Sequence, residues 1–171
     1  MNNIEIVTER FVLRTLSEND VSLRYLSWIN GENASPYISY DGSYKQLQSY
    51  VIDKSNKQNI LFLGIFLKDN LQHIGNIKYE PMDIEKHYAN LGILIGEKKW
   101  QGVGVGPEVI KASAKWLQKE KGIQQIVLRV KIANESAVKA YKKVGFSEKN
   151  TPYISKVEGI HLSMVWDLPT L

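Results

Sequence analysis

The sequence predicts an α/β fold of the mixed α+β kind, in which about four helices flank a mostly antiparallel central sheet of about seven strands. Two observations carry this prediction. Asp69 and Asn70 stand between two apolar runs, which is typical of an antiparallel hairpin. The second half of the chain reads strand, helix, strand, helix, strand, which favours one parallel pair in the middle of the sheet. The 171 residues show no linker and no repeat, so we expect a single domain over residues 1–171.

The first half of the chain predicts the antiparallel strands and two helices. Loose alternation of apolar and polar residues indicates a strand over residues 4–14. Ser17 and Ser43 each precede a helical apolar pattern and are typical N-caps. The other expectations here are an apolar face of Leu23, Leu26 and Ile29 on the first helix, a turn-rich loop over 31–42 with Pro36 and several tyrosines, an end of the second helix near Lys57, and strands over 60–67 and 72–79.

The second half predicts the parallel pair and the end of the sheet. A strand over residues 88–96 runs into a glycine-rich loop, and apolar residues then recur at helical spacing from Val105 to Leu117. Pro107 suits the first turn of this helix and Gly122 suits its end. The remaining expectations are a buried strand over 126–130, a helix over 134–144 that Gly145 ends, and two strands over 146–156 and 160–166 joined near Glu158 and Gly159.

Composition argues against several classes of protein. With 43% hydrophobic and 23% charged residues, no apolar run near ~20 residues and no signal-peptide pattern, the sequence is that of a cytoplasmic globular protein without a membrane partner. The absence of cysteine argues against disulfides and a cysteine nucleophile, and three scattered histidines predict no metal site. The net charge of +4 comes from scattered lysines without an aromatic platform, so no nucleic acid is expected as a partner.

The stretch from Gln101 to Gly106 contains three glycines between a strand and a helix start. The N-terminus of a helix has unpaired N–H groups and a partial positive charge, and both favour a phosphate. The spacing lacks the third glycine of the dinucleotide fingerprint, and no Gly-Lys-Ser/Thr sequence completes a P-loop. A strand-to-helix turn that binds nothing remains the alternative.

A second pattern lies on the helix predicted over residues 134–144. Ala137, Ala140, Tyr141 and Val144 share one face at helical spacing. Taken alone, Tyr141 is typical of a half-buried core aromatic and Asn134 of an N-cap.

Together these two patterns resemble the GNAT acyltransferases, which use acetyl-CoA. Gln101, Gly104 and Gly106 resemble the pyrophosphate loop of that family, and the stretch from Asn134 to Phe146 resembles its second conserved segment. The opening Thr-Glu-Arg-Phe-Val-Leu-Arg at residues 8–14, followed by Asp20, resembles the RimJ/RimL-like branch. The resemblance covers nearly the whole chain.

The resemblance implies an N-acetyltransferase with the GNAT fold, whose parallel pair is splayed. The pantetheine arm of acetyl-CoA would lie along the strand before the loop, Asn134 would bind the arm, and Lys143 would reach the outer phosphate. Tyr141 would be the catalytic residue that protonates the departing thiolate, and an amide near Leu94 or Ile95 would stabilise the oxyanion. The acetyl-CoA-binding residues implied are Ile93, Leu94, Ile95, Gln101, Gly102, Val103, Gly104, Val105, Gly106, Asn134, Ala137, Tyr141 and Lys143.

Three questions stay open from the sequence. The general base could be Glu80, Asp83, Glu85, His87, His73 or His161, or a chain of water molecules. The acceptor is interpreted as a small amine such as a nucleotide-linked amino sugar, and the aromatic-rich stretch 28–44 is expected to shape its pocket. The alternatives are a protein N-terminal amine, as in RimJ/RimL, or a non-catalytic acyl-CoA-binding module. Pairing of the last strand across a homodimer is a further option.

Overall fold

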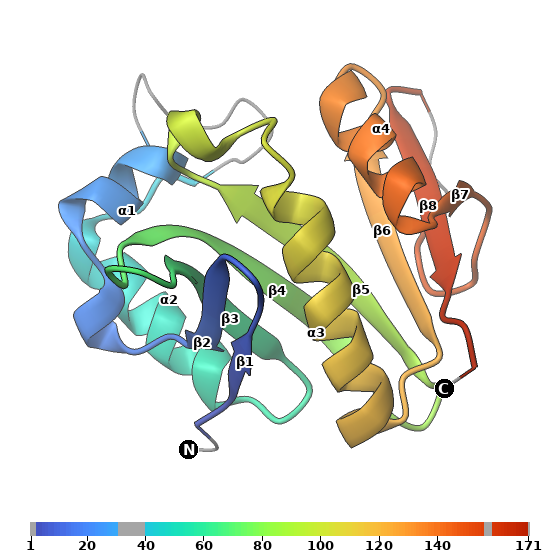
Figure 1. Cartoon of the computed structure of the whole chain (residues 1–171), viewed down its shortest axis with the longest axis horizontal. Coiled ribbons are helices and arrows are strands. Elements are labelled where there is room, and N and C mark those ends of the chain that lie inside the picture. The colour runs from blue at the N-terminus through green and yellow to red at the C-terminus, as the bar shows by residue number, and fades with distance from the viewer. Residues whose placement is uncertain (1–2, 31–39, 156–158, 171) are drawn as a thin grey trace.

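The computed structural model describes residues 3–30, 40–155 and 159–170, and its centre is one eight-stranded sheet in the order β1-β2-β3-β4-β5-β6-β8-β7 (Figure 1). Every neighbouring pair is antiparallel except β5 and β6, which are parallel. This confirms the predicted mixed sheet, with one strand more than expected. The strands are β1 Glu5–Val7, β2 Phe11–Thr15, β3 Leu61–Leu67, β4 His73–Asp83, β5 Tyr88–Ile95, β6 Gln125–Lys131, β7 Ser147–Glu148 and β8 His161–Asp167.

Four α-helices cover the sheet: α1 Leu23–Ile29, α2 Tyr44–Asn56, α3 Val105–Lys121 and α4 Glu135–Val144. In Figure 1, α3 and α4 lie over the near side of the sheet, where their apolar residues join one main core. The helices α1 and α2 pack over a second core that includes Leu16, Phe62 and Phe66. Strand β3 serves both cores, because Leu61, Leu63 and Ile65 belong to the first and alternate with Phe62 and Phe66 in the second.

The N-terminal expectation needs two corrections. Residues 4–14 form two strands, not one, and the Thr8 N–H donates to the Phe11 carbonyl at 2.8 Å to close the turn between them. Ser17 precedes only the short 3-10 turn η1 Glu18–Asp20, while α1 starts later, after its own cap Ser22. The buried face of α1 is therefore Tyr25, Trp28 and Ile29, and Leu23, expected on the apolar face, is 74% exposed.

The C-terminal expectation was also partly wrong. Instead of a strand over residues 146–156, Ser147 and Glu148 pair with Val165 and Met164 of β8, and the Lys149 N–H adds one hydrogen bond to the Ser163 carbonyl at 3.2 Å. The chain then leaves the sheet edge, and Tyr153 stacks on Tyr88 with ring centroids 3.8 Å apart. Stacking on the sheet face has replaced continued edge pairing. Residue 158, where the two strands were expected to join, lies outside the described residues, as does most of the loop expected over 31–42.

The helix ends follow the local sequence closely. Ser43 caps α2 with a reciprocal hydrogen-bond pair to Gln46, and α2 ends at Asn56 against an expected end near Lys57. Gly122 ends α3 with a φ of 68°, a left-handed value that glycine adopts without steric cost. None of the helices in the described ranges is long and apolar enough to cross a membrane.

Candidate active site

The two parallel strands separate part of the way along β5. Tyr88, Ala89 and Asn90 pair with Gln125, Ile126 and Val127 of β6. Beyond that point β6 continues beside β8, while β5 continues to Ile95 beside β4 alone (Figure 1). Residues 91–95 therefore have a strand partner on one side only, within the part of the chain that the structure describes. Their outward N–H and C=O groups form an open edge to which an extended chain of amides could pair.

The glycine loop continues directly from this open edge. Gly102 and Gly104 have φ values of 73° and 82°, so both are left-handed. A Cβ on Gly102 would meet nothing within 4 Å, which means that the backbone conformation, not space, requires glycine there. Gln101 donates from its side-chain nitrogen to the Ile95 carbonyl at 2.8 Å and so ties the loop to the end of β5.

Helix α3 begins at the end of this loop. Gly104 occupies its N-cap position and provides no side chain to bind the first N–H groups. Val103 is 49% exposed, whereas Val105 is buried and anchors the helix in the main core. Gly106 lies in the first turn, where the Ile93 side chain would lie 4.0 Å from an added Cβ. The predicted loop residues thus form one exposed N-terminus beside the open edge of β5.

Helix α4 contributes the second group of predicted residues. The Asn134 side chain accepts a 3.4 Å hydrogen bond from the Ala137 N–H, so it does cap the helix. Ala137 and Tyr141 pack against the main core. Burial raises the pKa of Tyr141 to about 12. Its hydroxyl makes no hydrogen bond to any described residue.

Lys143 behaves differently from the other predicted residues of α4. It is exposed, and at two positions after Tyr141 it lies about 200° around the helix from that side chain. None of the contacts in the described ranges links it to the glycine loop. Its predicted role at the outer phosphate remains a prediction.

The structure places the candidate general bases at different positions relative to the open edge of β5. Asp83, Glu85 and His87 lie in or beside the turn that joins β4 to β5, at the paired end of β5 and away from the glycine loop. Burial alone would raise the pKa of Glu80, but hydrogen bonds from Lys54 and Lys78 outweigh it and lower the pKa overall. A lowered pKa makes Glu80 a weaker base. We therefore interpret Glu80 as an ion-pair partner of the two lysines and not as the general base.

The two remaining histidines are placed differently. His73 is buried, stacks on Phe66 with centroids 4.8 Å apart, and lies 2.8 Å from the Asn76 side-chain oxygen through Nε2. Burial lowers its pKa. His161 starts β8 opposite Lys131, outside the open edge. Neither arrangement places an imidazole at the open edge of β5.

The face of β5 turned away from α3 is partly open, and we call it the back face. It carries Asn90, Gly92 and Leu94, since Leu91, Ile93 and Ile95 point into or toward the main core. Gly92 is exposed, and an added Cβ would meet only the Lys78 carbonyl, at 4.0 Å. Lys78 pairs directly with Gly92 across β4 and β5, and its ammonium group lies 2.6 Å from the Tyr50 hydroxyl and 2.7 Å from Glu80.

The aromatic residues expected to shape an acceptor pocket are largely structural. Trp28 is buried in the second core and packs so closely on Gly96 that an added Cβ would lie 1.9 Å from its ring. The Tyr44 hydroxyl donates to the Val21 carbonyl at 2.7 Å. Tyr40 packs against the second core, and Tyr37 lies outside the described residues.

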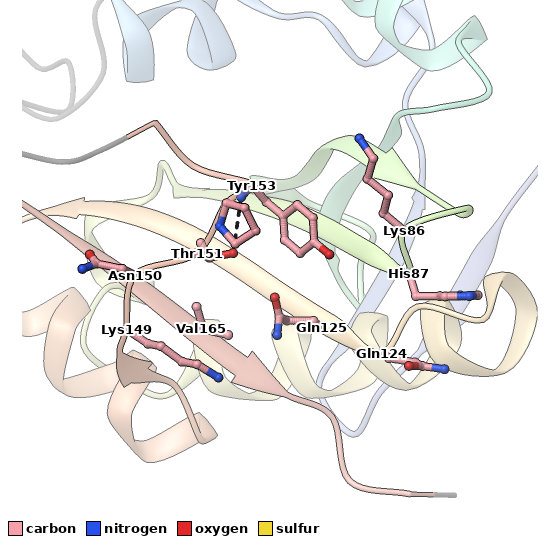
Figure 2. Close-up of a pocket in the computed structure, with 10 residues that line it drawn as sticks. Lys86, His87, Gln124, Gln125, Lys149, Asn150, Thr151, Tyr153 and Val165 are labelled. Carbon is pink, nitrogen blue, oxygen red and sulfur yellow. Dashed lines mark hydrogen bonds between the residues drawn. The ribbon is translucent and has the colours of Figure 1, made fainter.

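A hollow of about 330 Å³ lies at the paired end of β5, away from the glycine loop (Figure 2). Lys86 and His87, at the start of β5, form one side, and Lys149 and Tyr153, from the segment after β7, form another. Both lysines have acidic partners, Lys86 with Asp83 at 3.6 Å and Lys149 with Asp167 at 3.5 Å. We therefore assign this hollow no part in catalysis. No group of three or more potential metal ligands occurs in the described ranges.

In the sequence, Arg10 belongs to the stretch 8–14 that resembles RimJ/RimL-like proteins, and no pattern marks Glu108. The structure places both at the glycine loop: Arg10 donates from Nη1 to the Val103 carbonyl at 3.1 Å, and Glu108 lies in the first turn of α3. Ninety-eight positions separate the two residues in the sequence. No local pattern could have joined them.

The chain combines an open-edged strand, a glycine loop and a helix N-terminus on one side of a mixed sheet, an arrangement that suits an acyltransferase of the acetyl-CoA-dependent class. The chain matches the Acetyltransferase (GNAT) domain over residues 10–147 and belongs to that family. The protein is accordingly an acetyl-CoA-dependent acyltransferase.

The chain is also similar to individual proteins in sequence or in fold. An N-alpha-acetyltransferase of Sulfurisphaera tokodaii is 28% identical over 74 residues, which span 43% of this chain and 42% of that protein. The fold is similar to a ribosomal-protein-S5-alanine acetyltransferase from Vibrio fischeri, with a TM-score of 0.74, 14% identity and coverage of 96% and 97% of the two chains. It is also similar to a chimera of the spermidine N-acetyltransferase SpeG from Vibrio cholerae and hSSAT, with a TM-score of 0.74, 20% identity and coverage of 92% and 95%.

Proposed function

We propose that this enzyme transfers an acetyl group from acetyl-CoA to a primary amine, by direct attack of the amine on the thioester carbonyl. The observation that carries the proposal is the open edge of β5 over residues 91–95, which continues into the glycine loop. The edge offers backbone groups to the amides of the pantetheine arm, and the loop offers N–H groups to the pyrophosphate. Both groups belong to one molecule of acetyl-CoA.

The helix α4 would complete the acetyl-CoA site. The Asn134 side-chain oxygen already accepts from Ala137, and its amide nitrogen has no partner among the described residues, so it is available to a carbonyl of the arm. Tyr141 shares the buried face of α4 with Ala137 and faces the main core that also contacts Ile93. In this arrangement Tyr141 would lie near the thioester sulfur.

In the reaction a neutral amine forms the new N–C bond, the C–S bond breaks, the amine nitrogen loses one proton and the sulfur gains one. An N–H near Leu94 or Ile95 would stabilise the oxyanion of the tetrahedral intermediate. Tyr141, whose pKa burial raises to about 12, stays protonated at neutral pH. Because an ordinary thiol has a pKa of about 8.5, complete transfer from Tyr141 to a free thiolate is uphill. Tyr141 therefore acts best as a hydrogen-bond donor to the sulfur while its negative charge develops.

For the acceptor we propose a small amine that also carries an anionic group, such as a nucleotide-linked amino sugar. The back face supports this choice by its charge. Lys54 and Lys78 share the single carboxylate Glu80, which leaves one positive charge uncompensated in that cluster. Arg129 is exposed and lies on the same face of β6 as Val127, beyond the point where the strands separate. A polycationic amine would be repelled by these groups, whereas a phosphate or carboxylate would be attracted.

A protein N-terminal amine is the second candidate acceptor. The name of the Sulfurisphaera relative, an N-alpha-acetyltransferase, favours it. The two candidates differ in what surrounds the amine: a sugar nucleotide brings phosphates, and an N-terminus brings a peptide chain. An assay can therefore separate them directly.

The test has a binding step and a turnover step. Titration calorimetry should show acetyl-CoA binding at micromolar affinity or better, and much weaker binding of NAD. Turnover is followed with a thiol reagent, which reports only released CoA because the chain contains no cysteine. The panel is a nucleotide-linked amino sugar, the free amino sugar, peptides with free N-termini, and spermidine. No acetyl-CoA binding at millimolar ligand would end the proposal, and turnover of the peptides alone would replace the acceptor.

A further inference from the structure

Arg10 connects three parts of the molecule that are far apart in the sequence. It lies in the turn between β1 and β2, and its Nε donates to Glu108 Oε2 at 2.8 Å in the first turn of α3. Its Nη1 donates to the Val103 carbonyl at 3.1 Å in the glycine loop. The backbone N–H of Arg10 donates to Glu108 Oε1 at 2.9 Å. One side chain thus fixes the loop relative to both the helix and the sheet.

Arg10 compensates the negative charge that Glu108 places at the N-terminus of α3. A carboxylate in the first turn of α3 would repel a phosphate bound at the same helix N-terminus. Here the carboxylate accepts hydrogen bonds from the Thr8 hydroxyl at 2.7 Å, from the Arg10 backbone and from Arg10 Nε. The positive charge of Arg10 and these hydrogen bonds compensate its negative charge. The helix N-terminus therefore keeps its attraction for anions.

The guanidinium group also has a donor to spare. Glu108 and Val103 occupy Nε and Nη1, while Nη2 makes no hydrogen bond to any described residue. Nη2 lies 3.5 Å from the position that a Cβ on Gly104 would occupy, at the N-cap of α3. The Arg10 side chain is 38% exposed. A charged donor without a partner among the described residues therefore lies beside the left-handed loop, on a side chain that is partly exposed.

We propose that Arg10 is a pyrophosphate-binding residue of the acetyl-CoA site, which shapes the loop through Val103 and Glu108 and donates from Nη2 to a phosphate oxygen. The inference rests on the proposed binding of acetyl-CoA. It adds a side-chain cation to a site otherwise built from backbone N–H groups. An arginine suits this place because its five donors are spread over three nitrogens, so one side chain can reach a carboxylate, a carbonyl and a phosphate that lie apart, whereas the three donors of a lysine share one nitrogen.

The first experiment compares two methionine variants. Arg10→Met keeps the apolar stem and removes the charge and every donor, and we expect the Kd for acetyl-CoA to rise about 10- to 100-fold, the range for one or two charge-assisted hydrogen bonds. Arg14→Met is the matched control, because Arg14 lies on the neighbouring β2 and pairs with Asp20 instead of the loop. We expect its Kd to stay within about twofold of wild type. Equal affinities for wild type and Arg10→Met would overturn the inference.

A second acetyl-donor molecule, which lacks the pyrophosphate, shows whether Arg10→Met weakens phosphate binding alone or disturbs the whole site. S-acetylpantetheine has the arm and the thioester but no pyrophosphate. Its binding, followed by ligand-observed NMR at millimolar concentration, should be the same in wild type and Arg10→Met. Equal weakening of both donors would show that Arg10 only supports the fold of the loop, and that would also overturn the inference.

The wild-type protein offers a measurement that needs no stable variant at Arg10. The chain has four arginines, so its guanidinium NMR spectrum is simple, and the three others can be assigned by substitution. Acetyl-CoA should shift the Arg10 signals saturably, and S-acetylpantetheine should not. If wild type binds no acetyl-CoA at all, the proposed function fails first. If acetyl-CoA binds without moving the Arg10 signals, only the inference on Arg10 fails.

Discussion

The two ends of strand β5 differ in what holds them. At the paired end, residues 88–90 lie between β4 and β6, Ala89 is fully buried, and Tyr88 is covered by Tyr153. At the open end, residues 91–95 pair with no described strand other than β4, and the strand leads into an exposed glycine loop. One strand thus supports the fold at one end and leaves hydrogen-bonding groups for a ligand at the other. The proposed acetyl-CoA site depends on strand pairing that stops before the strand does.

Replacing Tyr141 should have the largest effect of these variants. The loss should appear in kcat and not in acetyl-CoA binding or in the packing of α4. Tyr141→Phe removes only the hydroxyl, which has no partner among the described residues, so the packing of α4 should survive. We expect kcat to fall about 100-fold or more, the usual scale for loss of a positioned hydrogen-bond donor to developing negative charge, and the Kd for acetyl-CoA to change less than about threefold. Steady-state kinetics and calorimetry measure the two quantities. An unchanged kcat would remove Tyr141 from the mechanism.

Gly75→Ala tests how tightly the open end depends on β4. Gly75 pairs with Ile95, and an added Cβ would lie 2.2 Å from the Leu94 carbonyl oxygen and 3.1 Å from the Ile95 Cα, both backbone atoms. The strands must shift to accommodate it, so we expect the free energy of unfolding to fall by about 1–3 kcal/mol and the affinity for acetyl-CoA to fall with it. Urea denaturation and calorimetry are the measurements.

Gly92→Ala is the control for Gly75→Ala, on the same pair of strands. An added Cβ at Gly92 meets only the Lys78 carbonyl, at 4.0 Å, which is an ordinary contact. Stability should therefore stay within about 0.5 kcal/mol of wild type. A destabilisation equal to that of Gly75→Ala would show that any side chain harms β5, whatever space surrounds it.

The sequence predicted those parts of the fold that local chemistry determines. Ser43 and Gly122 mark helix ends through their own hydrogen-bonding and dihedral preferences, and the structure has helix ends at both. The order of strands around the glycine loop followed from apolar runs in the same way. The family, and with it the acyltransferase activity, was recognised from Gln101, Gly104, Gly106 and the Asn134 segment, and the match over residues 10–147 confirms it.

The errors and omissions depend on contacts that are distant in the sequence. Residues 150–155 do not continue the edge pairing along β8. Tyr153 instead stacks on Tyr88, which lies on the sheet face and sixty-five positions earlier in the sequence. Arg10 and Glu108 meet only because β1, β2 and α3 pack together, and nothing near either residue indicates the other. The charge state of Glu80 depends on Lys54 of α2 as well as Lys78 of its own strand. Such pairings appear only when the elements are assembled.

Apart from the control Gly92→Ala, the smallest expected effect concerns the paired end. Tyr153→Ala removes the ring that stacks on Tyr88 at 3.8 Å with an interplanar angle of 6°. An aromatic pair contributes about 0.5–1.5 kcal/mol beyond the area it buries, so the free energy of unfolding should fall by about 1 kcal/mol or slightly more. The open end is held by its pairing with β4, and Arg10 bonds the glycine loop. The Kd for acetyl-CoA should therefore stay within about twofold of wild type. A large loss of acetyl-CoA affinity in Tyr153→Ala, measured at a temperature where the variant is folded, would mean that the two ends of β5 are coupled. In that case it would be wrong that one end of β5 supports the fold and the other end independently binds the ligand.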